Sequence, residues 1–312
     1  MPGLDLGTDS TDPLDYPDYG KARLAGGLVN FEYWYLFPVS VLIATIAMAS
    51  GIGGAVFFSP LFIVLLKLEP SVAVGTALVT ELFGFTSGMY AYWKQRLIDV
   101  RLGLSLLMFS VPAAVVGSLS ADVLPAEVLK GIFAVGIIFI GSQLYSSYRR
   151  EEREKLDRNI KEVSSEHYES VLRDKKGNEY RYTVCNKNQG RMFAVIGAAF
   201  LGMISVGLAE LQEYHLVARC RIPSPVAVAT SIFVVVFTVL IASLGHLYNF
   251  TAHADSRVLT QVLSVVLFTI PGVIIGGQVG PLMQARLNPD AVKVGISFLF
   301  ITVGAFMLVT LT

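Results

Sequence analysis

The stretch SGIGGAVFFSP, residues 50–60, has three glycines within four positions inside the first long apolar region of the chain. Glycine weakens a helix by roughly 0.5–1 kcal/mol relative to alanine, so this cluster favours a break in a helix. If the region crosses a membrane, such a break is tolerated only where the backbone is buried in protein or lines a watery cavity. The glycines therefore indicate either a functional break or close packing between helices, since small residues also let membrane helices approach each other.

The composition indicates that this stretch belongs to a membrane protein. Of the 312 residues, 54% are apolar and only 15% are charged, and the mean hydropathy is +0.60. Apolar runs of bilayer length recur from about residue 33 to the C-terminal end. The formal net charge is zero, which gives no indication of nucleic-acid binding. We therefore expect an all-α polytopic membrane protein.

Charged and apolar regions divide the chain into four parts. The N-terminal tail, residues 1–33, is acidic and has no basic region followed by an apolar core, so we expect no cleavable signal. Two membrane regions, 34–148 and 192–312, flank a charged segment at 149–191. Opposite charges three and four residues apart predict that a helix extends into this segment, and alternation around DKKGN (174–178) predicts a β-hairpin.

Each membrane region contains five apolar segments, and the first two of each set are short. The segments are expected at 34–50, 54–68, 72–93, 102–121 and 128–148, and at 192–208, 210–222, 226–247, 258–280 and 290–311. The short ones fall below the ~20 residues that a helix needs to cross the hydrocarbon, and each pair meets at glycine. We predict that each pair is a re-entrant helical hairpin, followed by three transmembrane helices.

The two membrane regions also resemble each other in sequence. The matching stretches are EPSVAVGTALV (69–79) with PSPVAVATSIF (223–233), and SVPAAVVGS (110–118) with TIPGVIIGG (269–277). The first of these alignments also places Gly53 on Gly207 and Lys67 on Arg221. Self-similarity of this kind indicates a duplicated unit, and insertions in loops explain why the offset is slightly larger for the second match.

The distribution of lysine and arginine predicts the orientation of the two repeats. If the charged segment is cytoplasmic, most of the 24 basic residues lie inside, as the positive-inside rule favours. Both chain ends then lie outside, and the odd number of segments in each half makes the second repeat enter from the opposite face. Inverted repeats of this kind are the ground plan of many secondary transporters. We expect a multi-pass protein of the cell (inner) membrane.

The predicted breaks suit a small anion. A helix that begins inside the membrane presents free N–H groups and a positive dipole end. Glycines would let the anion approach the backbone, and hydroxyls near the starts of the following helices are further donors, although such hydroxyls often bond their own backbone. The candidate anion-binding residues are Gly51, Gly53, Gly54, Thr76, Gly207, Thr230 and Ser231.

Three carboxylates at membrane depth are candidates for proton coupling: Glu81, Glu210 and Glu213. Charged groups there cost at least ~2.5 kcal/mol each on insertion scales, so they usually have a partner or a function. Burial and a neighbouring anion both favour the neutral acid, so acidic groups beside an anion are consistent with proton exchange. The alternatives are that Glu210 or Glu213 caps a half-helix or bonds to Tyr214 or His215, and that Glu81 pairs across the repeat interface.

Cysteine and histidine give no indication of a metal site or of catalysis. Cys185 and Cys220 lie in unlike surroundings, and we expect neither a disulfide nor a metal site from them. The spacing of His215, His246 and His253 does not match metal ligands, so we expect these residues at the membrane interface. The motifs HExxH, GxSxG and GxGD do not occur, and we therefore expect no catalytic residue, no metal and no cofactor.

The paired motifs resemble those of the TauE/SafE sulfite exporter family, also called the toluenesulfonate uptake permease family. GIGGAVFFSPLFIVLLKLEPSVAVGTALV (51–79) is similar to the glycine-rich first motif, and RCRIPSPVAVATSIFVVVFTVLIASLGHL (219–247) is similar to its second-half counterpart. The resemblance covers 34–148 and 192–311. It implies transport of small sulfur-containing anions such as sulfite or organosulfonates.

One departure from the family pattern concerns the second break. It reads SVGLAELQEYH (205–215), with Glu210 and Glu213 where a glycine run is common, so the two hairpin tips differ chemically. An anion channel, or a permease for a different small anion, is the alternative function. The expected partners are a small anion and the lipid bilayer; the oligomeric state, the direction of transport and the coupling ion stay open.

Overall fold

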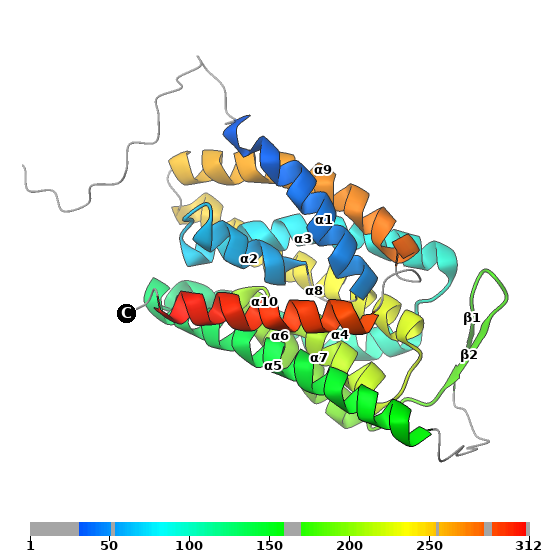
Figure 1. Cartoon of the computed structure of the whole chain (residues 1–312). Coiled ribbons are helices and arrows are strands. Elements are labelled where there is room, and N and C mark those ends of the chain that lie inside the picture. Colours follow the sequence, from blue (N-terminus) through cyan, green and yellow to red (C-terminus); the bar gives the residue numbers. More distant parts are fainter. Residues whose placement is uncertain (1–30, 51–53, 159–169, 254–255, 284–288, 310–312) are drawn as a thin grey trace, which may run out of the picture.

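The computed structural model describes residues 31–50, 54–158, 170–253, 256–283 and 289–309, and most of these are helical (Figure 1). The helices are η1 Phe31–Tyr35, α1 Leu36–Ser50, α2 Ala55–Val64, α3 Pro70–Gln95, α4 Val100–Val123, α5 Ala126–Arg158, α6 Lys187–Ile204, α7 Leu208–Glu213, the π-helical η2 Tyr214–Arg219, α8 Ser224–His253, α9 Ser256–Met283 and α10 Pro289–Val309. The strands are β1 Ser170–Arg173 and β2 Glu179–Tyr182.

Six helices in this described part are long and apolar enough to cross a membrane. They are α1 together with η1, α3, α4, α5, α8 and α9. The chain is therefore an all-α, multi-pass membrane protein. By length and composition the first helix qualifies as a span, although we expected it to be half of a re-entrant hairpin.

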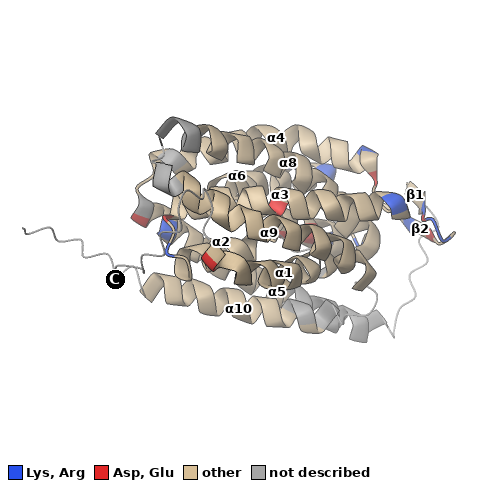
Figure 2. Cartoon of the chain, turned by 90° about the horizontal axis from the view of Figure 1, so that it is seen from above, with Lys and Arg blue, Asp and Glu red and all other residues tan. Residues whose placement is uncertain are grey.

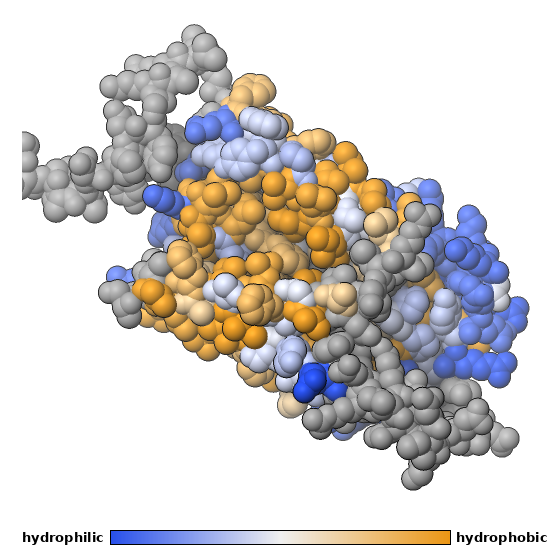
Figure 3. All heavy atoms as spheres, in the orientation of Figure 1, coloured by the Kyte–Doolittle hydropathy of each residue, from blue (hydrophilic) through white to orange (hydrophobic). Residues whose placement is uncertain are grey.

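The surface of the bundle is suited to lipid. Large apolar side chains such as Leu104, Met108, Val116 and Phe298 are mostly exposed along the helices. Figure 3 shows hydrophobic residues over the middle of the visible face and hydrophilic residues gathered at the end that carries β1 and β2. Figure 2 shows that the coloured charged residues likewise gather toward the two ends of the bundle, with a few acidic residues between them.

The two membrane regions interlock rather than forming separate bundles. The most extensive helix contacts pair α1 with α9, α4 with α6, α5 with α10, α3 with α9, α4 with α8 and α3 with α8. Each pair joins one helix of the first region to one of the second. In Figure 1 the start of α1 and the end of α10 lie toward the same end of the bundle, opposite β1 and β2.

Glycine permits the closest of these approaches. A Cβ at Gly117 in α4 would collide with the Ala199 carbonyl oxygen in α6. A Cβ at Gly276 in α9 would lie 2.6 Å from the Val41 carbonyl oxygen in α1. Only glycine fits at such backbone contacts, which are typical of helix interfaces in membranes.

The turns that follow the two short hairpins are built alike. In each turn a backbone N–H beyond the helix bonds to a carbonyl six residues earlier. These bonds are Leu68 N to Phe62 O (3.1 Å) and Ile222 N to Leu216 O (2.9 Å). The residues just before them, Lys67 and Arg221, adopt left-handed backbone with φ of 52° and 56°. All of these positions correspond when the two halves are aligned with Lys67 on Arg221.

The charged segment consists of a helix extension and a small hairpin in its described part. The helix α5 continues to Arg158, and β1 pairs with β2 antiparallel. The Asp174 carboxylate closes the turn by accepting from the backbone N–H of Asn178 at 2.8 Å. The Tyr182 hydroxyl donates to the Asp99 carboxylate at 2.7 Å and so fixes the hairpin to the start of α4. Burial and this bond raise the pKa of the Tyr182 phenol above its ordinary value.

Cys185 and Cys220 form a disulfide, contrary to the expectation from sequence. Their Cα atoms lie 5.1 Å apart although 35 positions separate them in sequence. The intervening chain forms α6, α7 and η2, which run into the bundle and return, so the chain just before α6 meets the residue after η2. The local sequence around each cysteine does not predict that the chain folds back in this way.

Candidate functional site

The first candidate site lies at the N-terminus of α2, directly after the glycine stretch. Gly54 precedes this helix and supplies no side-chain cap. The Glu81 carboxylate, from the middle of α3, accepts from the Ala55 backbone N–H at 3.0 Å. Glu81 is only 3% exposed. The partner of Glu81 is therefore a helix N-terminus in its own half, not a group across the repeat interface.

The second candidate site lies at the N-terminus of α7. Gly207 has a φ of 119°, a conformation that side chains rarely adopt, and ends the break after α6. The Glu210 carboxylate reaches back one turn and accepts from the Gly207 backbone N–H at 3.0 Å. Glu210 is 2% exposed. It thus caps the half-helix, which is one of the two roles that the sequence left open.

The two breaks approach each other in the interior of the bundle. The hydroxyls of Ser59 in α2 and Ser205 in the second break form a buried hydrogen bond. The Glu81 carboxyl also lies close enough to Glu210 for their charges to interact. Two helix N-termini, each occupied by a carboxylate of the protein, therefore meet in one buried region.

The third predicted carboxylate, Glu213, lies at the end of α7. Its side chain is buried and close enough to the Tyr92 hydroxyl for an electrostatic interaction. That hydroxyl donates to the Met48 carbonyl near the end of α1, at 2.9 Å. Glu213 therefore faces the junction of α1 with α3 rather than the N-terminus that Glu210 caps.

The predicted hydroxyl donors differ in what they bind. The Thr76 hydroxyl donates to the Val72 carbonyl of its own helix at 2.7 Å. The Thr230 hydroxyl accepts from the Asp99 backbone N–H at 3.0 Å and holds the turn before α4. The Ser231 hydroxyl is buried and has no hydrogen-bond partner. Of these three, Ser231 has the hydroxyl that is uncommitted.

Of the predicted first-half glycines, Gly51 and Gly53 lie outside the described residues. A Cβ at Gly54 would make ordinary contacts, 3.8 Å from the Ala47 Cβ and 3.9 Å from the Glu81 carboxylate. Packing alone therefore does not require glycine at position 54.

Gln212 is a buried polar residue that the sequence reasoning did not single out. It lies in α7 between Glu210 and Glu213, and both its amide oxygen and its amide nitrogen are buried without a hydrogen-bond partner. Its amide side chain within the stretch SVGLAELQEYH (205–215) could have indicated a buried polar group in the sequence.

Two of the three histidines that we expect at the membrane interface are buried within the protein. His215 and His246 are buried among helices, and a ring nitrogen of His246 lies 3.0 Å from the Gly202 carbonyl oxygen. The ring of His215 lies 3.5 Å from the Cys220 sulfur. The side chain of His253 lies outside those that the structure describes.

Six helices long and apolar enough to cross a membrane, with two buried carboxylates at helix N-termini, define a multi-pass membrane protein. The chain belongs to the TauE/SafE sulfite exporter family, whose sequence model matches residues 36–307. It is a membrane transporter and not an enzyme.

Two Bacillus subtilis proteins are among its relatives. The chain is 21% identical to the probable membrane transporter protein YunE over 276 residues, 86% of this chain and 94% of the relative. It is 25% identical to the probable membrane transporter protein YjnA over 256 residues, 80% of this chain and 90% of the relative. No solved structure matches the chain.

Proposed function

We propose that the chain is a proton-coupled secondary transporter of a small sulfur-containing anion, sulfite or an organosulfonate, in the cell (inner) membrane. The observation that carries this proposal is that Glu81 and Glu210 each accept a hydrogen bond at the N-terminus of a broken helix. A helix N-terminus binds anions through its free N–H groups and its dipole. The protein's own carboxylates therefore occupy the positions that suit a substrate anion.

Competition for these N–H groups gives a physical route to coupling. A carboxylate accepts a charge-assisted hydrogen bond, which is roughly twice as strong as a neutral one. Protonation removes the charge, weakens the bond to the backbone and ends the repulsion between the carboxylate and an incoming anion. Protonated Glu81 or Glu210 would thus release an N–H group to the anion, and proton and anion would cross together.

The inverted repeat belongs to the same proposal. It is supported by the turns at Lys67 and Arg221, which share one hydrogen-bond pattern, and by glycine contacts of the same kind between α4 and α6 and between α9 and α1. In this arrangement the segment 149–191 is cytoplasmic and both chain ends are external. Each half contributes one re-entrant hairpin to the anion site.

Site-directed labelling tests this orientation. Single cysteines at Ser10 and Ser165, in a chain with Cys185 and Cys220 replaced by serine, are exposed to an impermeant maleimide in intact cells. We expect labelling at position 10 and protection at position 165. Equal reactivity at both positions would contradict the inverted repeat.

The choice of a sulfur anion comes from the family, whose name is that of a sulfite exporter. Proteoliposomes are tested with radiolabelled sulfite and sulfoacetate, with and without a pH gradient. We expect uptake of at least one anion that is stimulated by the gradient. Uptake without any effect of the gradient would instead favour an anion channel or an uncoupled permease.

Glu210→Gln tests the role of that carboxyl, because glutamine imitates the protonated acid permanently. Anion binding and anion-for-anion exchange should persist, since neither needs proton turnover, while flux driven by a pH gradient should fail. Glu69→Gln is the matched control, because Glu69 is exposed and makes no side-chain cap. If Glu210 were only a cap, Glu210→Gln would lower thermal stability, anion binding and anion exchange together. If gradient-driven flux stays intact in Glu210→Gln, Glu210 does not carry the proton.

A further inference from the structure

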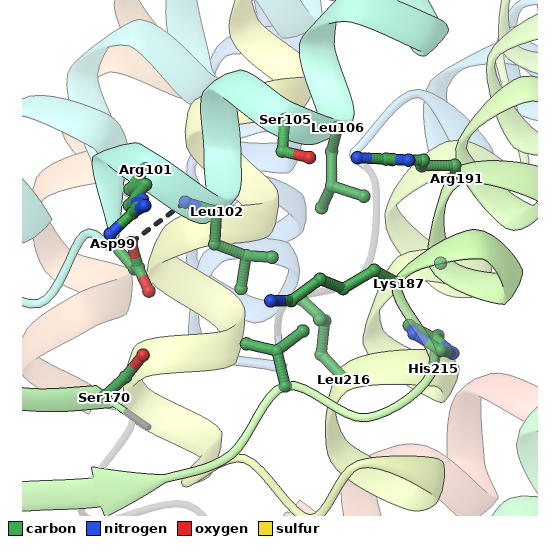
Figure 4. Close-up of a pocket in the computed structure, with 12 residues that line it drawn as sticks. Asp99, Arg101, Leu102, Ser105, Leu106, Ser170, Lys187, Arg191, His215 and Leu216 are labelled. Atoms are coloured by element: carbon green, nitrogen blue, oxygen red, sulfur yellow. Dashed lines mark hydrogen bonds between the residues drawn. The ribbon is translucent and has the colours of Figure 1, made fainter. Parts of the chain in front are cut away.

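A cavity with polar lining residues lies at the end of the bundle that carries the β-hairpin (Figure 4). It has a volume of about 360 Å³ and lies between the first turns of α4 and α6, the segment after β2, and η2. We call it the basic pocket. Its charged lining residues are Asp99, Arg101, Lys187 and Arg191.

The basic pocket has an excess of positive charge. Figure 4 shows Lys187 and Arg191 extending from α6 toward α4, with Arg101 and Asp99 on the opposite side. The one carboxylate among these residues is already engaged, because Asp99 accepts from the Leu102 N–H at 3.0 Å and from the Tyr182 hydroxyl at 2.7 Å. The lining therefore attracts anions, and the N-termini of α4 and α6 add their positive dipole ends.

Two polar atoms in the lining residues lack a hydrogen-bond partner. The His215 residue is only 2% exposed, and its ring Nδ1 has no partner. The Nε of Arg191 is likewise buried without one. Gly190 brings the ring close to α6, since a Cβ there would lie 2.8 Å from the His215 Nε2. Neither nitrogen contributes accessible surface to the cavity, so the cationic ends of Arg101, Lys187 and Arg191 are the groups that an anion there would meet.

The basic pocket is continuous in sequence with the second break. Glu210 caps α7, α7 leads directly into η2, and His215 and Leu216 of η2 line the pocket. Five helical residues span about 7 Å along a helix axis. His215 therefore follows Glu210 by about one and a half helical turns.

We propose that the basic pocket binds a small oxyanion at the end of the bundle from which η2 leads back to the second broken helix. The binding itself does not depend on the proposed function. Only the onward path of the anion, into the membrane, rests on the proposed anion transport. A sulfonate or sulfite fits, since it offers several oxygen acceptors to the guanidinium groups of Arg101 and Arg191 and the ammonium of Lys187. A lipid phosphate offers the same oxygen acceptors, but the occupant of the basic pocket in this proposal is the free anion.

Calorimetry with methanesulfonate on the purified full-length chain tests the binding. The double variant Lys187→Gln/Arg191→Gln removes two charges, and Lys94→Gln is the matched control, because Lys94 is an exposed cation at the end of α3 outside the pocket lining. We expect two anions per wild-type or control chain and one in the double variant, whose pocket affinity falls by about tenfold or more.

The stoichiometry separates this inference from the proposed function. If the site at the broken helices does not bind anions, the wild type binds one methanesulfonate and the double variant binds none, which still supports the pocket. Identical titrations of wild type and double variant would overturn it. The variant Lys187→Arg/Arg191→Lys keeps both charges and should still bind the second anion. If this variant binds only one anion, recognition by charge is refuted.

Two further measurements separate a free anion from a lipid headgroup. In nanodiscs of phosphatidylcholine, methanesulfonate should still bind in the pocket, and a minor fraction of the anionic lipid phosphatidylglycerol should not displace it. Binding of phosphatidylglycerol alone would overturn the proposal. In proteoliposomes that transport sulfite, the double variant should raise the KM about tenfold only for flux that starts from the pocket face.

Discussion

Replacement of Glu81 separates its structural role from its competition with the anion. The Ala55 N–H that it caps is buried, and Glu81→Ala leaves that donor without a partner. An orphaned buried donor costs about 1–3 kcal/mol. Glu81→Gln keeps an acceptor oxygen at the same place, so it should lower the free energy of unfolding by less than about 1 kcal/mol.

The same substitution should strengthen anion binding. Glu81 accepts from Ala55 at 3.0 Å, so an anion that took over this N–H would lie close to the displaced carboxylate. At a separation of roughly 5 Å and an effective dielectric constant of about 20, their repulsion is about 3 kcal/mol, or on the order of a hundredfold in affinity. Allowing for relaxation and solvent, we expect Glu81→Gln to bind methanesulfonate at least about tenfold more tightly.

Calorimetric titration and thermal unfolding in detergent provide the test. Wild type, Glu81→Gln, Glu81→Ala and the exposed-site control Glu69→Gln are compared at one pH and ionic strength. Unchanged or weaker affinity in a Glu81→Gln protein of wild-type melting temperature would refute the competition between carboxylate and anion. A melting temperature for Glu81→Ala equal to that of the wild type would refute the capping role.

Three other substitutions test the architecture. Gly117→Ala should destabilise the protein by about 1–3 kcal/mol. The control Gly295→Ala should not, because a Cβ at Gly295 meets nothing within 4 Å. Equal melting temperatures of the two variants would contradict the close contact between α4 and α6. Cys220→Ser should destabilise by up to about 4 kcal/mol for the 35-residue separation, and a reducing agent should shift the melting temperature of the wild type but not of this variant. Gly54→Ala should fold and transport, whereas Gly54→Val should fold and fail to transport, since its methyl groups would enter the space beside Glu81; transport by the valine variant would exclude an anion at this N-terminus.

The sequence was sufficient for those features that depend on local pattern. Ten apolar segments correspond to helices or helix pairs, because burial against neighbours or lipid requires long apolar stretches. The hairpin around Asp174 and Gly177 was readable because its turn residues and strand alternation act within a dozen positions. The alignment of the two halves pairs Lys67 with Arg221, which have the same backbone conformation.

Features that depend on the return path of the chain were not readable. The Cys185–Cys220 disulfide needs the hairpin of α6, α7 and η2 to fold back on its own start, which no spacing rule gives. The partner of Glu81 is a backbone N–H 26 residues earlier, and a backbone partner has no sequence signature. The Thr230 hydroxyl likewise accepts from the Asp99 N–H, 131 positions earlier, a backbone contact that no local pattern predicts.

The two helix N-termini are capped in different ways, and this asymmetry bears on the transport cycle. The cap of α2 comes from a neighbouring helix through Glu81, whereas the cap of α7 comes from its own first turn through Glu210. The position matching Glu210 in the first half is Val56, and the part of α8 that corresponds to the surroundings of Glu81, residues 234–240, contains no acid. The carboxylate that caps a helix N-terminus therefore comes from a different place in each half. In the proposed cycle, movement of α3 relative to α2 would uncover the first N-terminus, whereas rotation or protonation of the Glu210 side chain would uncover the second. The two carboxylates can then release their N–H groups at different steps, which a symmetric pair could not do.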